Sequence, residues 1–260
     1  MPEDPAGARL ILLGTAAEVD DGRLAALYTY PAYPEYPDRT WVRANFITSL
    51  DGGATVGGTS GGLAGPGDRV VFGLLRELAD VIVVGAGTVR TENYAGAHLS
   101  VRQRQNRADR GQSEVPALAI VTRSGRLARE MAVFTRTEVP PLVLTCSAAI
   151  GEARPRLAGV ADVIDCSDID PGHVDMSAAL AALAARGLCR VLTEGGPALL
   201  GSFIEHDLLD ELCLTIAPIV VGGQAPRIAT GPVQALTRMR RGHILTDDAG
   251  YLYTRYVKDR

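Results

Sequence analysis

The chain has 260 residues, of which 47% are apolar and 22% charged, and its 26 Lys and Arg residues stand against 30 Asp and Glu residues. This composition is typical of one large or two small globular domains and excludes a disordered chain. The formal net charge of −4 disfavours nucleic acid or an anionic membrane as a partner. No apolar run approaches the roughly 20 residues of a transmembrane helix, so we expect a cytoplasmic protein.

The first predicted strand covers residues 41–47 and leads toward the glycine-rich segment 52–67. We predict that this segment is a loop beside a ligand, because glycine allows the backbone to approach a bound group closely. A helix over 67–79 follows, opened by Pro66. Its apolar residues recur at helical spacing: Val70, Val71, Leu74, Leu75 and Leu78.

Short apolar runs then alternate with helical segments, which predicts an α/β sheet with parallel crossovers. We expect the helix before the last run at 176–186, and residues 103–112 as a solvated surface loop. After residue 208 the pattern changes to antiparallel strands at one edge, with Asp247 and Asp248 in a hairpin turn. The predicted parallel strands are 81–85, 117–122, 142–145, 162–165 and 188–193.

No metal site or disulfide is expected. The cysteines, Cys146, Cys166, Cys189 and Cys213, form no CxxC pair and lie among apolar residues, so we predict buried thiols. The four histidines are isolated from one another in the sequence.

Three segments follow predicted strands, where ligands of parallel sheets bind. They are SLDG (49–52), VGAGTVRTE (84–92) and TEGGPALLGS (193–202). The second is an incomplete dinucleotide fingerprint, since Arg90 stands where GxGxxG requires glycine. In the third, Pro197 occupies the first helical position, so the free N–H groups of the next turn predict an anion site suited to a pyrophosphate. It is not a nucleotide-hydrolysing P-loop, because Ser202 stands where lysine is required.

Together and in this order, these motifs resemble the pyrimidine reductases of riboflavin biosynthesis, best known as the C-terminal domain of a bifunctional deaminase-reductase. The resemblance runs from about residue 41 to 256 and implies a dihydrofolate-reductase-like fold. That fold has a mixed, mostly parallel sheet with helices on both faces and antiparallel C-terminal strands. It further implies NADPH as cofactor and a homodimer. We expect a single reductase domain over 41–260, with 1–40 as an N-terminal extension packed on it. The HxE and PCxxC motifs of the deaminase half are absent.

The resemblance also implies roles for individual residues. Ser60, Arg76 and Glu194 are implied as substrate contacts, and Arg102 as a further contact to the same anion. Ser124 is implied for NADP; beside it, Arg123 follows a predicted strand and offers a donor for the 2′-phosphate. The other implied cofactor residues are Ile47, Gly85, Thr88, Val89, Glu92, Gly195, Gly196, Pro197, Ala198, Leu199, Leu200, Gly201 and Ser202.

The chemistry so implied is hydride transfer to an electrophilic C=N carbon of a ribosylaminopyrimidine phosphate. A carboxyl group near the nitrogen would favour the protonated iminium, with Glu194 as the first candidate and Asp51 as the second. Gly53 and Gly62 stand where the family has a cation and an aromatic residue. Two alternatives therefore remain open: a dihydrofolate or pterin reductase on the same fold, and a non-enzymatic NADP-binding protein.

Overall fold

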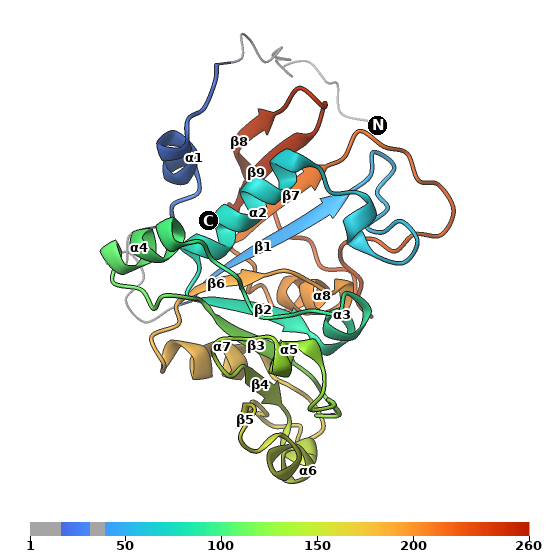
Figure 1. The fold of residues 1–260 in the computed structure, drawn as a ribbon. Coiled ribbons are helices and arrows are strands. Elements are labelled where there is room, and N and C mark those ends of the chain that lie inside the picture. Colours follow the sequence, from blue (N-terminus) through green and yellow to red (C-terminus); the bar gives the residue numbers. More distant parts are fainter. Residues whose placement is uncertain (1–16, 32–39, 260) are drawn as a thin grey trace.

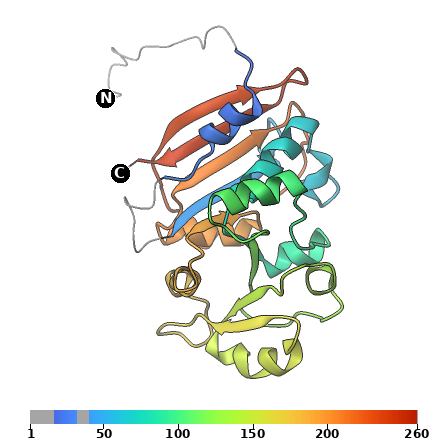
Figure 2. The same ribbon diagram turned by 60° about the vertical axis from the view of Figure 1, so that its left-hand side comes forward.

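The computed structural model describes residues 17–31 and 40–259. Their core is a sheet of nine strands in the order β5-β4-β3-β2-β6-β1-β7-β9-β8 (Figures 1 and 2). Strands β5 to β7 in that order pair in parallel, whereas β9 is antiparallel to both β7 and β8. The strands are β1 Trp41–Thr48, β2 Val81–Gly85, β3 Ala117–Val121, β4 Leu142–Thr145, β5 Asp162–Asp165, β6 Arg190–Thr193, β7 Glu211–Ile216, β8 Met239–Thr246 and β9 Leu252–Lys258.

Helices cover both faces of this sheet (Figures 1 and 2). On one face, Val71 and Leu75 of α2 join a core with Ile82 and Val84 of β2. On the other face, Val83 of the same strand lies in a second core with residues of α7 and α8. The helices are α1 Asp21–Leu27, the short 3-10 helix η2 Ser60–Gly62, α2 Pro66–Leu78, α3 Ala86–Thr91, α4 Val101–Asp109, α5 Ala132–Thr135, α6 Ser147–Leu157, α7 Met176–Ala184 and α8 Pro197–Glu205.

The predicted α/β sheet with antiparallel C-terminal strands is confirmed, as are the positions of its parallel strands. Asp247 lies in the β8–β9 turn, where its carbonyl accepts a hydrogen bond from the Gly250 N–H at 3.0 Å. All four cysteines are buried and free of disulfides. Val70, expected on the apolar face of α2, is instead 57% exposed.

The prediction of a solvated loop over 103–112 is wrong, because most of it forms α4. Ser100 caps this helix by accepting from the Gln103 N–H, and the Gln103 side chain accepts in return from the Ser100 N–H. Such a capping box satisfies two donors that an open helix end leaves unpaired. The segment is polar because its side chains bind neighbouring backbone, not because it is solvated throughout.

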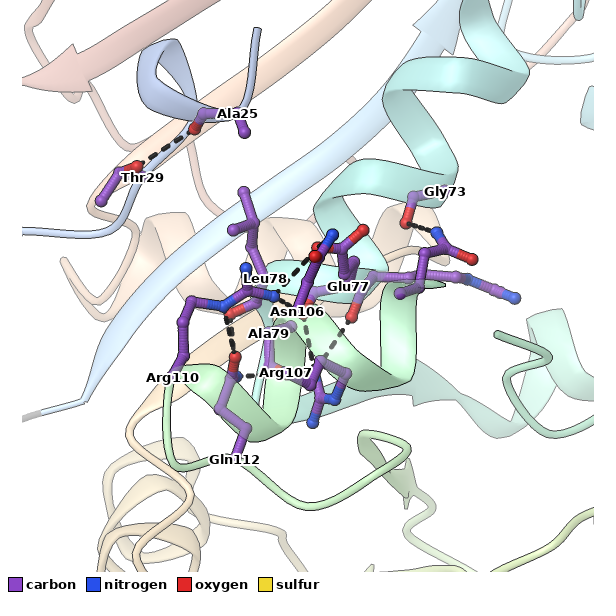
Figure 3. A network of polar contacts seen from close by, with 12 residues as sticks. Ala25, Thr29, Gly73, Glu77, Leu78, Ala79, Asn106, Arg107, Arg110 and Gln112 are labelled. Carbon is purple, nitrogen blue, oxygen red and sulfur yellow. Dashed lines mark hydrogen bonds and ion pairs between the residues drawn. The ribbon is translucent and has the colours of Figure 1, made fainter. Parts of the chain in front are cut away.

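Arg107 of α4 is fully buried at the C-terminal end of α2 (Figure 3). Its Nη1 donates to the carbonyls of Glu77 at 2.8 Å and Ala79 at 2.5 Å, and its Nε donates to the Ser113 carbonyl at 2.7 Å. Burial lowers the pKa of Arg107 to about 10, so it remains charged at neutral pH. Carbonyls at a helix end carry partial negative charge, and this guanidinium therefore fixes α2 against α4.

The described part of the N-terminal region, residues 17–31, contributes two buried tyrosines to the core, Tyr28 and Tyr30. Tyr30 lies under the guanidinium of Arg43 in β1, 3.9 Å from the ring centroid. Arg43 in turn pairs with Glu211 of β7 at 2.7 Å, and both side chains are fully buried. Arg255 of β9 donates to the same carboxylate at 2.7 Å.

None of the helices within 17–31 and 40–259 is long and apolar enough to cross a membrane.

Candidate active site

A cavity of about 350 Å³ opens beside the carboxyl ends of β1, β2 and β6. Its walls come from the glycine-rich loop, the first turns of α2, the segment after β2 and the β6–α8 turn. This is where a parallel sheet places ligands, since loops and helix N-termini meet there. The lining residues are Asn45, Phe46, Ile47, Ala54, Thr55, Ser60, Gly61, Ala64, Asp68, Arg69, Phe72, Thr88, Glu92, Tyr94, Glu194, Gly195, Gly196, Pro197 and Ile228.

Glu194 is held at the cavity wall by three donors. Arg76 forms a two-point ion pair with it, Nε to Oε1 at 2.8 Å and Nη2 to Oε2 at 2.6 Å. The hydroxyl of Tyr94 donates to Oε2, and Arg76 Nη2 also donates to that hydroxyl oxygen at 2.6 Å. The Glu194 side chain is 2% exposed and that of Arg76 is 17% exposed. Arg76 and Glu194, both predicted to contact the substrate, therefore lie together, but they bind each other.

Tyr94 and Phe72 place aromatic rings at this cluster. The Arg76 guanidinium lies 4.1 Å from the Phe72 ring centroid and 5.4 Å from that of Tyr94. Burial, followed by the negative charge of Glu194, raises the pKa of Tyr94 well above its usual value, so its hydroxyl stays a donor. Gly62 stands where the resemblance implies an aromatic residue, and Phe72 and Tyr94 instead place aromatic rings in the cavity wall.

The β6–α8 turn brings bare backbone to the cavity. The Gly85 N–H donates to the Gly195 carbonyl at 2.8 Å, and the Gly195–Gly196 peptide bond is cis. A Cβ on Gly196 would lie 2.8 Å from Thr88 Oγ1. The absent side chains leave the backbone of the turn open beside Pro197, which begins α8. The first N–H groups of a helix lack intrahelical partners, so this geometry suits a pyrophosphate.

Ser60 and Glu92, predicted for substrate and cofactor respectively, are also joined. Glu92 Oε1 accepts from the Ser60 N–H at 3.0 Å and from its hydroxyl at 3.2 Å. This contact ties the glycine-rich loop to the segment after α3. The predicted position of that loop beside a ligand site agrees with its five residues in the cavity wall.

Asp51, Arg102, Arg123 and Ser124 are among the predicted residues that do not line the cavity. Asp51 accepts from Ser49 Oγ at 2.5 Å and from the backbone N–H groups of Val221 and Gly222 at 3.1 and 2.7 Å. The Ser49 hydroxyl and these N–H groups lower its pKa to about 2. It therefore holds a loop and carries no proton to donate at neutral pH. Arg102 forms a 3.1 Å ion pair with Asp21, and the Arg102 side chain is 74% exposed. Arg123 and Ser124 follow β3 and are exposed.

Part of the predicted 195–202 stretch has a packing role. Leu199 and Leu200 are buried in the core between α8 and the sheet. A Cβ on Gly201 would overlap the Thr230 carbonyl oxygen and lie 2.7 Å from its carbon. The Gly201 position is therefore explained by a crossing backbone. Val89 is likewise a core residue. Gly195, Gly196 and Pro197 are the members that line the cavity.

Sequence reasoning missed Asp68, Arg69 and Phe72, although a signal was available. Asp68, Phe72 and Arg76 are spaced by four residues, which places them on one face of α2. Burial raises the pKa of Asp68, opposed by a hydrogen bond from Thr215 and by the charge of Arg69. Asn45 and Tyr94 carried no such spacing signal.

The β8–β9 hairpin supports the start of α2. The Tyr251 hydroxyl donates to the Leu63 carbonyl at 3.0 Å, and a Cβ on Gly65 would lie 2.8 Å from the Tyr251 ring. The Tyr253 hydroxyl donates to Asp247 Oδ2 at 2.6 Å, and both groups lie against Gly67.

No cluster of three or more His, Cys, Asp or Glu side chains suited to a metal ion occurs in the part of the chain that the structure describes.

The mostly parallel sheet and the cavity at the carboxyl ends of its strands are typical of an α/β protein that binds a small molecule, and comparison with known sequences identifies the family. The sequence pattern of the RibD C-terminal domain family matches residues 40–253. The chain belongs to this family, and the predicted dihydrofolate-reductase-like fold is confirmed.

Named relatives agree. A 2,5-diamino-6-ribosylamino-4(3H)-pyrimidinone 5′-phosphate reductase of Methanothermobacter thermautotrophicus is 28% identical over 189 residues, covering 73% of this chain and 82% of that one. A protein of the same name from Archaeoglobus fulgidus is 28% identical over 165 residues, covering 63% of this chain and 74% of that one. The chain spans 49% of a Bacillus amyloliquefaciens riboflavin biosynthesis protein RibD that is 28% identical to it. A pyrimidine reductase-like protein of Corynebacterium diphtheriae superposes with a TM-score of 0.78 at 26% identity, covering 91% of this chain and 98% of that one.

Proposed function

We propose that this protein is an NADPH-dependent reductase that reduces a C=N bond of a phosphorylated ribosylaminopyrimidine in riboflavin biosynthesis. One observation carries the proposal: the backbone of Gly195 and Gly196 and the buried carboxylate of Glu194 lie side by side in one cavity. The names of the relatives agree with this reaction.

The residues present fit a dinucleotide cofactor. Because Gly196 has no side chain, a space remains open beside Thr88; a Cβ on Gly196 would lie 2.8 Å from Thr88 Oγ1. Helix α8 begins at the next residue, Pro197. This backbone would hold the pyrophosphate, with Thr88 beside it and Ile47 in the adjoining wall. When bound, the nicotinamide supplies a hydride. Arg123 and Ser124 follow a neighbouring strand and would hold the 2′-phosphate.

The protein's own groups then orient the substrate and stabilise charge. Arg76 and Tyr94 fix both oxygens of Glu194, so its carboxylate keeps one orientation toward the cavity. A fixed carboxylate beside an imine nitrogen stabilises the positive charge of the protonated, more electrophilic form. Phe72 and Ile228 give the cavity apolar walls that exclude water from the acceptor carbon.

A dihydropterin is a second candidate substrate, favoured by Asp68. This carboxyl group lies in the cavity wall on α2, where burial raises its pKa. A carboxyl group can hold the aminopyrimidine edge of a pterin through paired hydrogen bonds.

Oxidation of NADPH by the purified protein tests the proposal, with the phosphorylated pyrimidine, with dihydrofolate and with no acceptor. Turnover with the pyrimidine supports the proposal, and turnover with dihydrofolate alone replaces it with the pterin reaction. NADPH binding without either turnover leaves a non-enzymatic NADP-binding protein.

Two variants test the cofactor site. Gly196→Ala should weaken NADPH binding at least about tenfold, about 1.4 kcal/mol, whereas Gly151→Ala, at an exposed position of α6, should leave it unchanged. Arg123→Glu should lower kcat/KM for NADPH about tenfold and spare NADH. Equal losses with both cofactors would instead show a role for Arg123 in folding.

A further inference from the structure

We propose that Glu92 couples cofactor binding to the position of the glycine-rich loop. One oxygen of its carboxylate holds Ser60 of the loop, and the other accepts a hydrogen bond from a ribose hydroxyl of the bound dinucleotide. The inference rests on the proposed function for the presence of that dinucleotide. It adds a positioning residue, through which the cofactor orders one wall of the substrate cavity.

The central part of the loop, residues 55–62, lies between two fixed points. On one side, the Ala54 N–H donates to the Pro226 carbonyl at 2.9 Å. On the other side, Leu63 is fully buried, and its carbonyl accepts from the Tyr251 hydroxyl at 3.0 Å. The eight residues in between are exposed or half-buried, so little burial holds them in place.

The contact between Ser60 and Glu92 is what joins this central part to another element. The Val56 N–H donates to the Thr59 carbonyl at 2.9 Å, which is a bond within the loop. Among the described residues, hydrogen bonds from 55–62 to another element come from the Ser60 N–H and hydroxyl, both to Glu92 Oε1, at 3.0 and 3.2 Å. The position of the loop therefore depends on the orientation of one carboxylate.

Glu92 also lies at the proposed cofactor site. It follows Thr88 by four residues, and its N–H donates to the Thr88 carbonyl at 2.9 Å. Residues four apart share a helix face, and both line the cavity. Thr88 lies against Gly196, in the turn suited to a pyrophosphate. Because each ribose of a dinucleotide is attached to its pyrophosphate, a ribose would lie within reach of Glu92.

The Glu92 carboxylate has an oxygen available for that ribose. Oε1 accepts both bonds from Ser60, whereas Oε2 accepts none from a residue within 17–31 or 40–259. A carboxylate has acceptor sites on both oxygens, and its bonds from hydroxyl groups are among the stronger hydrogen bonds in proteins. Glu92 can therefore hold the loop and the cofactor at the same time.

A bound cofactor would stabilise the loop through conformational entropy. A free glutamate side chain loses rotamer freedom when it binds Ser60, and a cofactor that already fixes this side chain removes that cost. Such coupling is reciprocal, so an ordered loop also strengthens cofactor binding. Because Thr55, Ser60 and Gly61 line the cavity, this wall of the substrate site becomes ordered when the cofactor binds.

Hydrogen–deuterium exchange of peptides within 55–62, with and without saturating NADPH, tests the coupling. The variants are Glu92→Met, Glu92→Gln and the control Glu130→Met, at an exposed glutamate outside the cavity wall. We expect NADPH to slow exchange at least about fivefold in the parent and the control, and less than twofold in Glu92→Met. Glu92→Gln should recover part of the slowing, because its amide can accept from Ser60 and donate to a hydroxyl oxygen.

The outcomes separate this inference from the proposed function. Equal slowing in the parent and Glu92→Met, or no slowing in a parent that binds NADPH, overturns the inference, and turnover of the pyrimidine would leave the reductase function standing. Slowing that Glu92→Met abolishes supports the inference even if no pyrimidine is reduced. A parent that binds no NADPH overturns both.

Ser60→Ala provides a second variant if Glu92→Met does not bind NADPH. It removes the hydroxyl donor of the loop and leaves the Glu92 carboxylate available to the cofactor. Slowing at least twofold smaller than in the parent supports the inference, and slowing equal to that of the parent overturns it.

Discussion

Replacing Arg76 by methionine should destabilise the protein more than replacing Glu194 by methionine. Arg76→Met leaves the Glu194 carboxylate at 2% exposure with the Tyr94 hydroxyl as its remaining donor. Removing one partner of a buried ion pair costs about 3 to 5 kcal/mol, and we expect this range for Arg76→Met. Glu194→Met leaves a guanidinium that is 17% exposed and contacts Phe72, so its cost should be smaller, about 2 to 3 kcal/mol.

Urea unfolding of the parent, both single variants and the double variant measures these losses. Because the double variant leaves neither charge unpaired, its loss should be well below the sum of the two single losses. Additive losses, or single losses below about 1 kcal/mol as for surface pairs, would refute the view that Glu194 depends on Arg76.

Three further predictions concern the fold. Gly201→Ala should cost about 1 to 3 kcal/mol, because its Cβ would overlap the Thr230 backbone, whereas Gly151→Ala, with open space around its Cβ, should be neutral or stabilising in thermal unfolding. Arg107→Met should cost about 3 kcal/mol or more in urea unfolding and Arg107→Lys less, since a lysine can still donate to the α2 carbonyls; equal losses would contradict this reason. Burial, followed by the charge of Arg255, lowers the pKa of His243 from 6.5 to about 4, so its contribution to stability is present above pH 6.5 and lost as the pH falls toward 4. His243→Gln should therefore lose less stability than the parent between these pH values, and parallel pH profiles would exclude this role.

The sequence predicted the sheet well because strands buried on both faces must be continuous apolar runs, as in residues 81–85. It failed at α4, because this helix is stabilised by a capping box and by arginines that bind the C-terminal end of α2, and neither produces an apolar stripe. Periodicity detects only helices whose stability comes from an apolar face.

The candidate site was predicted in part for a related reason. Glu194, Gly195 and Gly196 follow a strand directly, so their position depends on local structure. The roles of Arg76 and Asp51 depend on partners more than 100 residues away, Glu194 and the backbone of Val221 and Gly222. A sequence motif predicts on which loop or helix a side chain lies. It does not predict which residue, distant in the sequence, that side chain contacts.

The bracing of α2 at both of its ends has a consequence for how this cavity can vary. Arg107 fixes the C-terminal end, while Tyr251 and Tyr253 of the β8–β9 hairpin fix the approach to its first turn. Asp68 and Arg69 therefore project from a rigid support, so substitutions at these two positions can change the chemistry of the wall without moving it. Removal of the last two strands would have the opposite effect. It would leave every lining residue in the chain but remove the contacts that hold the start of α2, and with it the positions of Asp68 and Arg69 in the cavity wall.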